Sequence, residues 1–287
     1  MPNDVSRREL LSALGIGALA VHTAAGADES PQFSGLDHLE FFVSNVEKST
    51  AFYAQAFGAK VMKNNRTTRR YVRLGAAYMA MDTGPQLRVD HICAGIPGFR
   101  IASMHALLEQ RGVAYRDYPS GNDLSVGDPD GGVRLQLAAD DGWSALARGT
   151  ASPESVPVNG DPLRRPRQTI FHPLGLDHVL LNVPDPEKSA AFYEKILGPV
   201  AQRNNNRIWF QVGTSRIGLL KTPDGQRAGV NHFCVLAAGF DYDAAVKKLE
   251  QAGARIEMPE VAGAPEFRDP DGYLVQVMGR GRVIRAK

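Results

Sequence analysis

The chain has 287 residues, of which 43% are hydrophobic and 22% are charged. This length and composition predict a folded globular protein of about two domains, and they exclude a wholly disordered, collagen-like or membrane-spanning chain. The net charge of +2 gives no basic face for nucleic acid or an anionic membrane, and two cysteines are too few for a disulfide scaffold.

Residues 1–27 have the features of an export signal. An Arg-Arg pair precedes an apolar run over residues 10–21, and Ala25-Gly26-Ala27 forms an A-x-A cleavage site. A helix over this run would be about 18 Å long, too short to cross a hydrocarbon core of about 30 Å. The segment resembles a twin-arginine (Tat) signal peptide, although Leu10 and Ser12 replace the preferred Phe and Lys.

This resemblance implies that the Tat machinery exports the folded chain, which becomes periplasmic or secreted and has no membrane contact after cleavage. The Tat route also suits a protein that takes up a metal before release. A chance Arg-Arg pair ahead of a disordered arm is the alternative.

The remainder of the chain is an internal repeat. Residues 35–58 read GLDHLEFFVSNVEKSTAFYAQAFG and residues 175–198 read GLDHVLLNVPDPEKSAAFYEKILG, an offset of 140 with half of the positions identical. Two further blocks recur in the same order, VDHIC with VNHFC and DPDG with DPDG. The sequence therefore predicts two homologous modules, at 36–139 and 175–280.

Residues 140–174 are predicted to be a linker between the modules. They contain five prolines among Ser, Gly and Arg residues. Such a composition does not favour a helix or a central strand, so the segment is expected to cross the surface.

Each module contains two passes of one pattern. A buried strand leads to a helix that begins after Asn45 or Asp185 and ends at Gly58 or Gly198, and two short strands follow. A second strand and helix then lead through a Pro-Asp-Gly turn to a closing strand. The aromatic residues at helical spacing, among them Tyr53, are predicted to be core. The pattern predicts a βαβββ unit that is used four times.

The paired units, each pair opening with Leu-Asp-His and closing with Asp-Pro-Asp-Gly, resemble the vicinal oxygen chelate superfamily. This family includes glyoxalase I, the type I extradiol dioxygenases and the bleomycin-resistance proteins. The resemblance covers nearly all of the chain after residue 27. It implies an α+β fold in which each module forms an open, curved eight-stranded sheet around a cavity.

The resemblance also implies a metal site in each module. Two family ligand positions on the first and fifth strands and a third on the closing strand are occupied by His38, His91 and Gln136 in module one and by His178, His232 and Gln276 in module two. The family's usual third ligand, Glu, is thus Gln in both modules. Ala80 and Gly218 stand at the fourth ligand position of glyoxalase I, where neither can bind a metal.

Two imidazoles and an amide oxygen leave positions open for water, oxygen or a chelating substrate. The neutral amide weakens metal affinity but leaves the ion more positive, which favours Lewis-acid chemistry. The expected cofactor is a divalent metal, Fe²⁺ first, with Mn²⁺ or Zn²⁺ as alternatives. The turn of standard family length favours module two over module one.

Other polar residues are weaker candidates. Glu40 shares a face with His38 and is a candidate ligand or base, although an ion-pair partner is the simpler interpretation. Cys93 and Cys234 are expected to be buried thiols, with a thiolate ligand as the alternative. Further pocket candidates are Asn182, Asn231, Trp209, Gln211, Tyr273, Tyr71 and Arg73. The sequence assigns no catalytic residue.

Two main functions follow. The first is an exported metalloenzyme whose small substrate chelates the ion through adjacent oxygens, in an extradiol-dioxygenase-like or lyase/isomerase-like reaction. The dioxygenase's Tyr before the closing turn is replaced by Ser125 or Glu266, and glyoxalase I would lack its fourth ligand and its cytosolic glutathione. The second is a metal-free binding protein of the bleomycin-resistance type, with both inherited sites empty. A purely structural role and a homo-oligomer also remain open.

Overall fold

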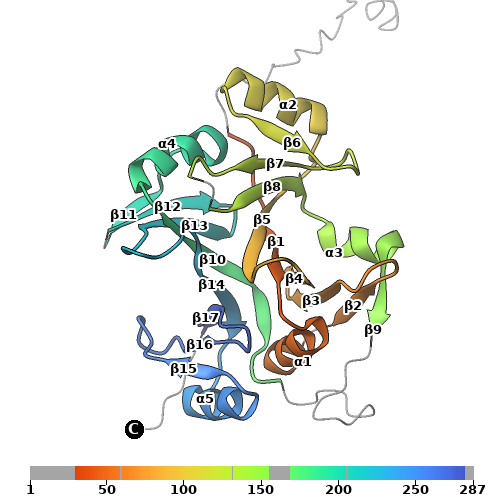
Figure 1. Ribbon diagram of the computed structural model, residues 1–287, viewed down its shortest axis with the longest axis vertical. Helices are drawn as coiled ribbons and strands as arrows, with labels where there is room; N and C mark the ends of the chain where they lie inside the picture. The colour runs from red at the N-terminus through yellow and green to blue at the C-terminus, as the bar shows by residue number, and fades with distance from the viewer. Residues whose placement is uncertain (1–29, 59, 131, 155–168, 205, 282–287) are drawn as a thin grey trace, which may run out of the picture.

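The computed structural model describes residues 30–58, 60–130, 132–154, 169–204 and 206–281. They form two curved sheets with helices at both ends of the molecule (Figure 1). The predicted signal peptide lies outside the described residues. Within the described part of the chain, no helix combines the length and apolar character needed to cross a membrane.

The first sheet has nine strands in the order β6-β7-β8-β5-β1-β4-β3-β2-β9. The histidine-bearing strands β1 and β5 are antiparallel neighbours at its centre. Its elements are β1 (Gly35–Phe42), α1 (Val46–Phe57), β2 (Val61–Asn64), β3 (Arg70–Leu74), β4 (Ala77–Asp82), β5 (Arg88–Ile96), α2 (Ile101–Gln110), β6 (Tyr115–Asp117), β7 (Leu124–Gly127), β8 (Arg134–Ala139), α3 (Gly142–Ala145), the π-helix η1 (Leu146–Thr150) and β9 (Ala151–Glu154).

The second sheet has eight strands in the order β11-β12-β13-β10-β14-β17-β16-β15. Strands β10 and β14 occupy the places that β1 and β5 have in the first sheet. Its elements are β10 (Pro173–Val183), α4 (Pro186–Leu197), β11 (Gln202–Asn204), β12 (Arg207–Val212), β13 (Ser215–Lys221), β14 (Gly229–Ala238), α5 (Tyr242–Gln251), β15 (Arg255–Glu257), β16 (Glu266–Arg268) and β17 (Leu274–Arg280).

The predicted α+β fold with four βαβββ units and two open curved sheets is confirmed. Module one adds a ninth strand, because β9 pairs with the edge strand β2 along its whole length. The expectation that residues 140–174 contain no helix is wrong for 142–150, where α3 and η1 form before the first proline at Pro153.

The first helix of each module starts and stops as its sequence predicts. The side chain of Asn45 accepts the backbone N–H of Lys48 at 2.8 Å and caps α1, which ends at Gly58 in the left-handed conformation (φ 62°). Asp185 caps α4 in the same way. The aromatic residues of α1 are buried, as expected.

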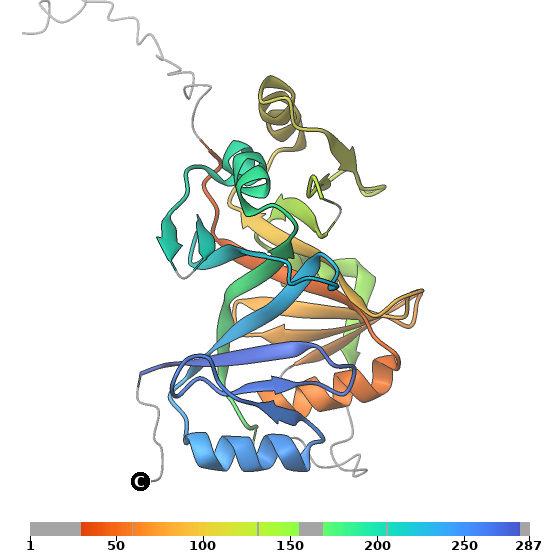
Figure 2. The same ribbon diagram turned by 60° about the vertical axis from the view of Figure 1, so that its left-hand side comes forward.

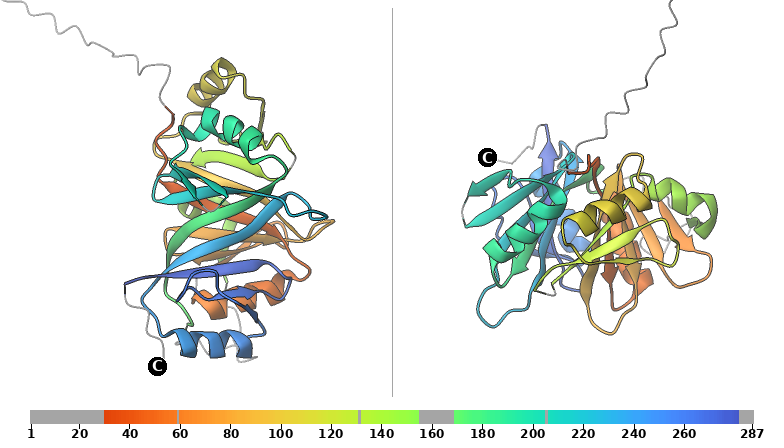
Figure 3. Two further views of the ribbon diagram at one scale, coloured as in Figure 1. Left: turned by 90° about the vertical axis from the view of Figure 1, so that its left-hand side faces the viewer. Right: turned by 90° about the horizontal axis from the view of Figure 1, so that it is seen from above.

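The two sheets pack against each other through the faces opposite the histidines. Phe41 of β1 meets Phe233 of β14, with ring centroids 5.2 Å apart. Helices α1 and α5 lie at one end of the molecule and α2 and α4 at the other (Figures 2 and 3). The first unit of each module therefore lies beside the second unit of the other.

Tyrosines on the first helices reach across this interface. The Tyr53 hydroxyl donates a 2.7 Å hydrogen bond to Asp269, the first residue of the closing turn of module two. Burial, and then the charge of Asp128 in module one, raise the pKa of the matching Tyr193. The repeated Asp-Pro-Asp-Gly turn thus holds the other module in place as well as leading into its own last strand.

Candidate metal centres

In each module the central pair of strands brings two imidazoles into contact. His38 Nε2 lies 3.2 Å from His91 Nε2 in module one, and His178 Nε2 lies 3.1 Å from His232 Nε2 in module two. All four side chains are buried. The histidines that the sequence singled out therefore meet in space, in two matching pairs.

In module one, both rings point their other nitrogen at a carboxylate. His38 Nδ1 lies 2.7 Å from Asp37 Oδ1, and His91 Nδ1 lies 3.1 Å from Asp90 Oδ2. Burial alone would raise the pKa of Asp90, but its hydrogen bonds with His91 and Arg134 lower it to about 2. Because an ionised carboxylate only accepts, each Nδ1 must carry the proton.

In module two, one carboxylate is replaced by an amide. His178 Nδ1 lies 2.6 Å from Asp177 Oδ1, and His232 Nδ1 lies 2.9 Å from Asn231 Oδ1. Asn231 donates its own amide N–H to Asn182 Oδ1 at 3.1 Å, which turns its oxygen toward the ring. Both imidazoles are again fixed with a proton on Nδ1.

β-Bulges put these supporting side chains beside their histidines. Adjacent residues of a regular strand point to opposite faces, so the residue before a histidine would face away from it. The pairing of β1 with β5 shifts register between Leu36 and His38 and again between Glu40 and Phe41, which makes Asp37 and Asp90 the extra residues. Matching shifts between β10 and β14 do the same for Asp177 and Asn231.

In each pair at least one ring turns a lone pair toward its partner. A neutral imidazole protonated on Nδ1 has a bare acceptor at Nε2. Burial, then the charges of His178 and Arg207, lower the pKa of His232 to about 3, and burial likewise lowers the pKa of His91. Each of these rings is therefore neutral at physiological pH and turns an unprotonated nitrogen toward its partner. A metal ion between the two rings would be bound by the Nε2 lone pair of each neutral imidazole.

The spacing of the paired nitrogens suits a shared metal ion. At metal–nitrogen bonds of about 2.0–2.1 Å, two ligands stand about 2.9 Å apart at a right angle and about 3.4 Å apart at a tetrahedral angle. The observed separations of 3.1 and 3.2 Å fall between these values. The separation of the two nitrogens therefore fits two ligands of one ion.

The predicted glutamines lie on the neighbouring closing strands. Gln136 of β8 donates its amide N–H to Asp123, and its buried Oε1 has no hydrogen-bond partner among the described residues. In module two, Gln276 Nε2 donates to Glu266 Oε1 at 2.8 Å. In both modules a carboxylate therefore holds the amide N–H, which leaves the amide oxygen as the available ligand atom.

The centre of module two opens onto a cavity of about 290 Å³. It is lined by His178, Asn204, Arg207, Trp209, Arg216, His232, Glu260, Val261, Gln276 and Met278. The two histidines and the glutamine predicted as ligands thus share one hollow. Trp209 packs edge-on to His178, with ring centroids 5.3 Å apart, and Arg216 lies over the indole.

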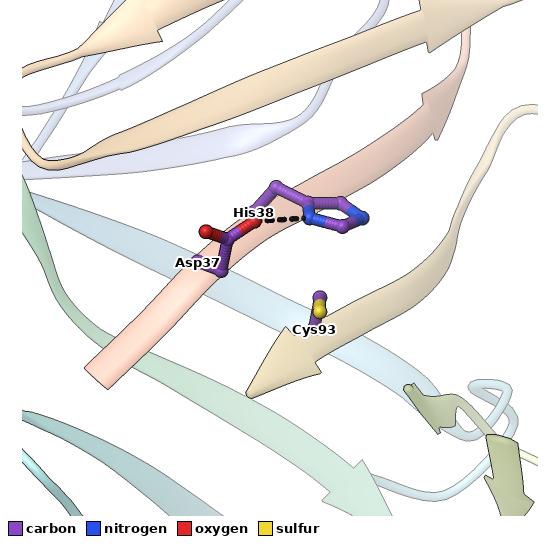
Figure 4. A group of neighbouring side chains, drawn as sticks. All are labelled: Asp37, His38 and Cys93. Carbon is purple, nitrogen blue, oxygen red and sulfur yellow. Dashed lines mark hydrogen bonds and ion pairs between the residues drawn. The ribbon is translucent and has the colours of Figure 1, made fainter. Parts of the chain in front are cut away.

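A second grouping, Asp37, His38 and Cys93, is also compact, as is Asp177, His178 and Cys234 in module two. Figure 4 shows the hydrogen bond between Asp37 and Nδ1 of His38, with the thiol of Cys93 on the neighbouring strand. Burial raises the pKa of both cysteines well above the ordinary value, so the thiols stay protonated and are poor ligands. The predicted reduced, buried cysteines agree with this arrangement.

The weaker candidate residues named from the sequence have different surroundings in the structure. Glu40 forms a 2.6 Å ion pair with Arg69, the simpler of the two predicted roles. Tyr273 and Gln211 do not belong to a site: Tyr273 packs against Phe41 at the interface between modules, and Gln211 donates to backbone carbonyls of its own hairpin.

The supporting residues Asp37, Asp90 and Asp177 were missed by the sequence analysis. The only signal was that an Asp directly precedes three of the four paired histidines, and in a regular strand that position faces away. Ala80 and Gly218 lie on β4 and β13 and offer no ligand atom, as expected.

Comparison with known proteins places the chain in a family. The family model "Glyoxalase/Bleomycin resistance protein/Dioxygenase superfamily" matches residues 35–115 and 175–277. The chain belongs to this superfamily, as its repeated motifs predict.

Its similarity to individual proteins is more distant. It is 22% identical to a lactoylglutathione lyase of Schizosaccharomyces pombe over 85% of this chain and 95% of that protein. Among solved structures, it resembles a 2,3-dioxygenase from Pseudomonas sp. KL28 (TM-score 0.67, 16% identity, 88% and 94% covered). A Mn(II)-bound glyoxalase from Novosphingobium aromaticivorans is also similar (TM-score 0.62, 16% identity, 90% and 89% covered). The structural similarities show the shared fold.

Proposed function

We propose that the chain is an exported metal-dependent enzyme whose module two acts on a small substrate that chelates a divalent ion through adjacent oxygens. The observation that carries the proposal is the pair of opposed Nε2 atoms of His178 and His232, 3.1 Å apart in the cavity that Gln276 also lines. In a binding protein without a metal, the unprotonated Nε2 of His232 would face only the Nε2 of His178 in a buried site.

The residues of the cavity have separable roles in this proposal. His178, His232 and the Gln276 oxygen would hold the ion, and Asp177 and Asn231 fix the two rings in the required tautomer. The ion would polarise the substrate oxygens as a Lewis acid. A cavity of about 290 Å³ suits a small molecule, since ligand pockets usually measure about 300–1,000 Å³.

The donor set favours Fe²⁺, with Mn²⁺ or Zn²⁺ as alternatives. Two imidazoles and an amide oxygen approach the facial triad of non-haem iron sites, with open positions for substrate. Similarity to a lactoylglutathione lyase and to a 2,3-dioxygenase supports either a lyase-like or a dioxygenase-like reaction. Oxygen uptake with substituted catechols, set against conversion of a 2-oxoaldehyde–thiol adduct, separates the two reactions.

Metal analysis of protein purified after its own export tests the proposal. We expect bound metal in the wild type and the loss of one equivalent in the His178→Ala/His232→Ala variant. The matched control is His105→Ala/His172→Ala, which removes two histidines outside both pairs and should lose none. A wild type that binds an aromatic ligand while free of metal would instead establish the second function, a metal-free binding protein.

Export is proposed from the sequence alone. Replacing Arg7 and Arg8 by lysine should retain the protein in the cytoplasm if the Tat route is used. Cell fractionation of the producing bacterium measures this, and unchanged export would contradict the proposal.

A further inference from the structure

The two histidine pairs have matching geometry but different charges around them. Their Nε2–Nε2 separations are 3.2 and 3.1 Å, and all four histidines are between 4 and 8% exposed. In both modules a carboxylate, Asp123 or Glu266, also holds the amide N–H of the third predicted ligand. A difference in metal affinity between the modules would therefore arise from the side chains that surround the imidazoles.

Module one has two carboxylates at positions where module two has uncharged side chains. Glu40 and Leu180 occupy the same position, since each is paired with the second histidine of its module. Glu40 Oε2 lies 3.6 Å from His91 Nδ1, and Asp90 Oδ2 lies 3.1 Å from the same nitrogen. In module two the residue before the second histidine is Asn231, whose neutral amide oxygen faces the ring nitrogen at 2.9 Å.

Module two has a positive charge where module one has a phenol. Strand pairing sets Tyr78 opposite His38 and Arg216 opposite His178. Arg216 forms a 2.9 Å ion pair with Asp177, on the same oxygen that accepts the Nδ1 proton of His178. The guanidinium therefore offsets part of the charge of the carboxylate that supports this ring, whereas the Tyr78 ring stacks on His38 without a charge.

The ion pairs around the two centres are buried at opposite ends. In module one, Arg88 and Arg134 bind Asp90, and their side chains are 53 and 39% exposed against 6% for the aspartate. In module two, the side chain of Arg207 is 20% exposed and that of its partner Glu260 is 48% exposed. Water screens the exposed partner more than the buried one, so the anion dominates near the first centre and the cation near the second.

The charges that act on the second histidine of each pair follow the same pattern. Besides the partner imidazole, they are the carboxylates of Glu40 and Asp90 on His91. On His232, again besides the partner imidazole, the charge is the guanidinium of Arg207. A divalent cation between the rings is attracted by the carboxylates and repelled by the guanidinium.

We propose that both pairs bind a divalent ion and that module one binds it more tightly, so that the first equivalent of metal occupies the His38–His91 pair. The use of a metal rests on the proposed function, and the order of affinity rests on the matched substitutions around the rings. Loss of one group that supports a ligand histidine typically costs about 10–100-fold in metal affinity. We therefore expect the Kd of module one to be at least about tenfold lower, or about 1.4 kcal/mol.

Full-length proteins that keep one pair each measure this order. His178→Ala/His232→Ala leaves module one, His38→Ala/His91→Ala leaves module two, and competition with a Zn²⁺ indicator dye gives each Kd. A module-two Kd equal to or below that of module one would overturn the inference. Binding in module one alone would support the inference and contradict the proposed function, whereas binding in module two alone would do the reverse. Binding in neither module would contradict both.

Exchanging the supporting groups tests the physical cause. In the module-one protein, Asp90→Asn should raise the Kd about tenfold. In the module-two protein, Asn231→Asp should lower it about tenfold, with Asn182 turning its amide N–H toward the new carboxylate. The matched control is Asp117→Asn, which alters a 2.7 Å contact with His105 outside both centres and should change neither Kd. Exchange variants that leave both Kd values unchanged would overturn the inference.

The two tryptophans report the order of filling in protein whose histidines are intact, which also decides the matter if an alanine variant fails to fold. Trp209 packs edge-on to His178, and Trp143 lies 6.0 Å from Tyr78, which stacks on His38. Co²⁺ is titrated into the Trp209→Phe and Trp143→Phe proteins, and quenching of the remaining indole is recorded. Quenching of Trp143 should precede that of Trp209. Simultaneous quenching, or quenching of Trp209 first, would overturn the inference.

Discussion

The replacement Gln276→Glu restores the carboxylate that the family usually has at the third ligand position, and the structure predicts that it destabilises the metal-free protein. Gln276 and Glu266 are both buried, and the amide N–H of Gln276 donates to the Glu266 carboxylate at 2.8 Å. Glu266 also accepts the backbone N–H of Glu260 at 3.1 Å, so it is held in place. The variant would set two carboxylates against each other.

The expected loss follows from the hydrogen bond that is removed. A hydrogen bond to a charged group contributes about 1.5–3 kcal/mol, and the new repulsion adds to its loss, so about 2–3 kcal/mol is a conservative figure. For a chain of this size, this corresponds to a fall of about 4–12 °C in Tm. Two carboxyl groups in contact repel each other only when both are ionised, so the cost should be small at low pH and grow as the pH rises.

A divalent ion should reverse the loss. With Mn²⁺ at about 100 times its Kd, binding contributes about 2.7 kcal/mol, and the second carboxylate strengthens that binding. Thermal unfolding of Gln276→Glu with and without Mn²⁺, at pH 5 and pH 8, measures both effects. We expect the variant to be less stable than the wild type without metal and to gain more from it.

The double variant Glu266→Gln/Gln276→Glu is the matched control, because it exchanges the amide and the carboxylate and restores the hydrogen bond. It should regain most of the lost stability without metal. A Gln276→Glu protein as stable as the wild type at pH 8 would refute the assigned hydrogen bond. A Mn²⁺ response no larger than that of the wild type would refute the orientation of residue 276 toward the ion.

Three further predictions concern other contacts. Tyr53→Phe removes the donor to buried Asp269, whose pKa is raised chiefly by burial, so it should cost about 1.5–3 kcal/mol at pH 7 in a denaturant titration and less as the pH falls and Asp269 takes up a proton. The lowered pKa of His232 means that the folded state binds fewer protons than the unfolded state, so stability should fall as the pH drops from about 6.5 toward 3, and His232→Gln should flatten that part of the Tm profile. Gly218→Ala places a Cβ 2.6 Å from Trp209 and should cost about 1–3 kcal/mol in chemical denaturation, whereas an unchanged midpoint would show that Trp209 moves freely.

Most of the fold could be predicted from the sequence because the two modules repeat the same pattern of motifs. The duplicated blocks placed four histidines at matched positions. Because strand residues alternate between two faces, assuming that one histidine of a module points inward was enough to assign the residues that share its face. Helix boundaries followed from local chemistry. Asn45 and Asp185 accept N–H groups of the first turn, and Gly58 adopts a left-handed conformation that is unfavourable for residues with a side chain. Such signals depend on neighbouring residues and can be read without tertiary structure.

What the sequence could not predict depends on departures from regular geometry or on contacts between distant segments. Asp37 supports His38 only because a bulge turns two successive side chains toward the same site. Tyr53 was correctly placed in the core, but its partner Asp269 lies in the other module. Periodicity carries no information about either feature.

Residues 141–154 illustrate how composition can mislead. Prolines predicted a linker over 140–174, yet they begin only at Pro153, and Trp143 and Leu146 precede them on a short helical stretch. The apolar residues Met62, Tyr71 and Tyr78 look like ordinary strand residues in the sequence. Their packing against Trp143 and Leu146 is visible only in the structure, where β9 also joins the edge of the sheet.

Duplication has produced two centres with the same histidine pair and different surroundings. The histidine pairs have nearly the same spacing, 3.2 and 3.1 Å, and sit on equivalent strands, so differences in function must arise from what surrounds them. Module one surrounds its pair with carboxylates and with Tyr78 stacked on His38, whereas module two has Asn231 in place of Asp90 and Arg216 in place of Tyr78, beside its cavity. What lies around each pair, rather than the pair itself, is therefore where the two centres differ.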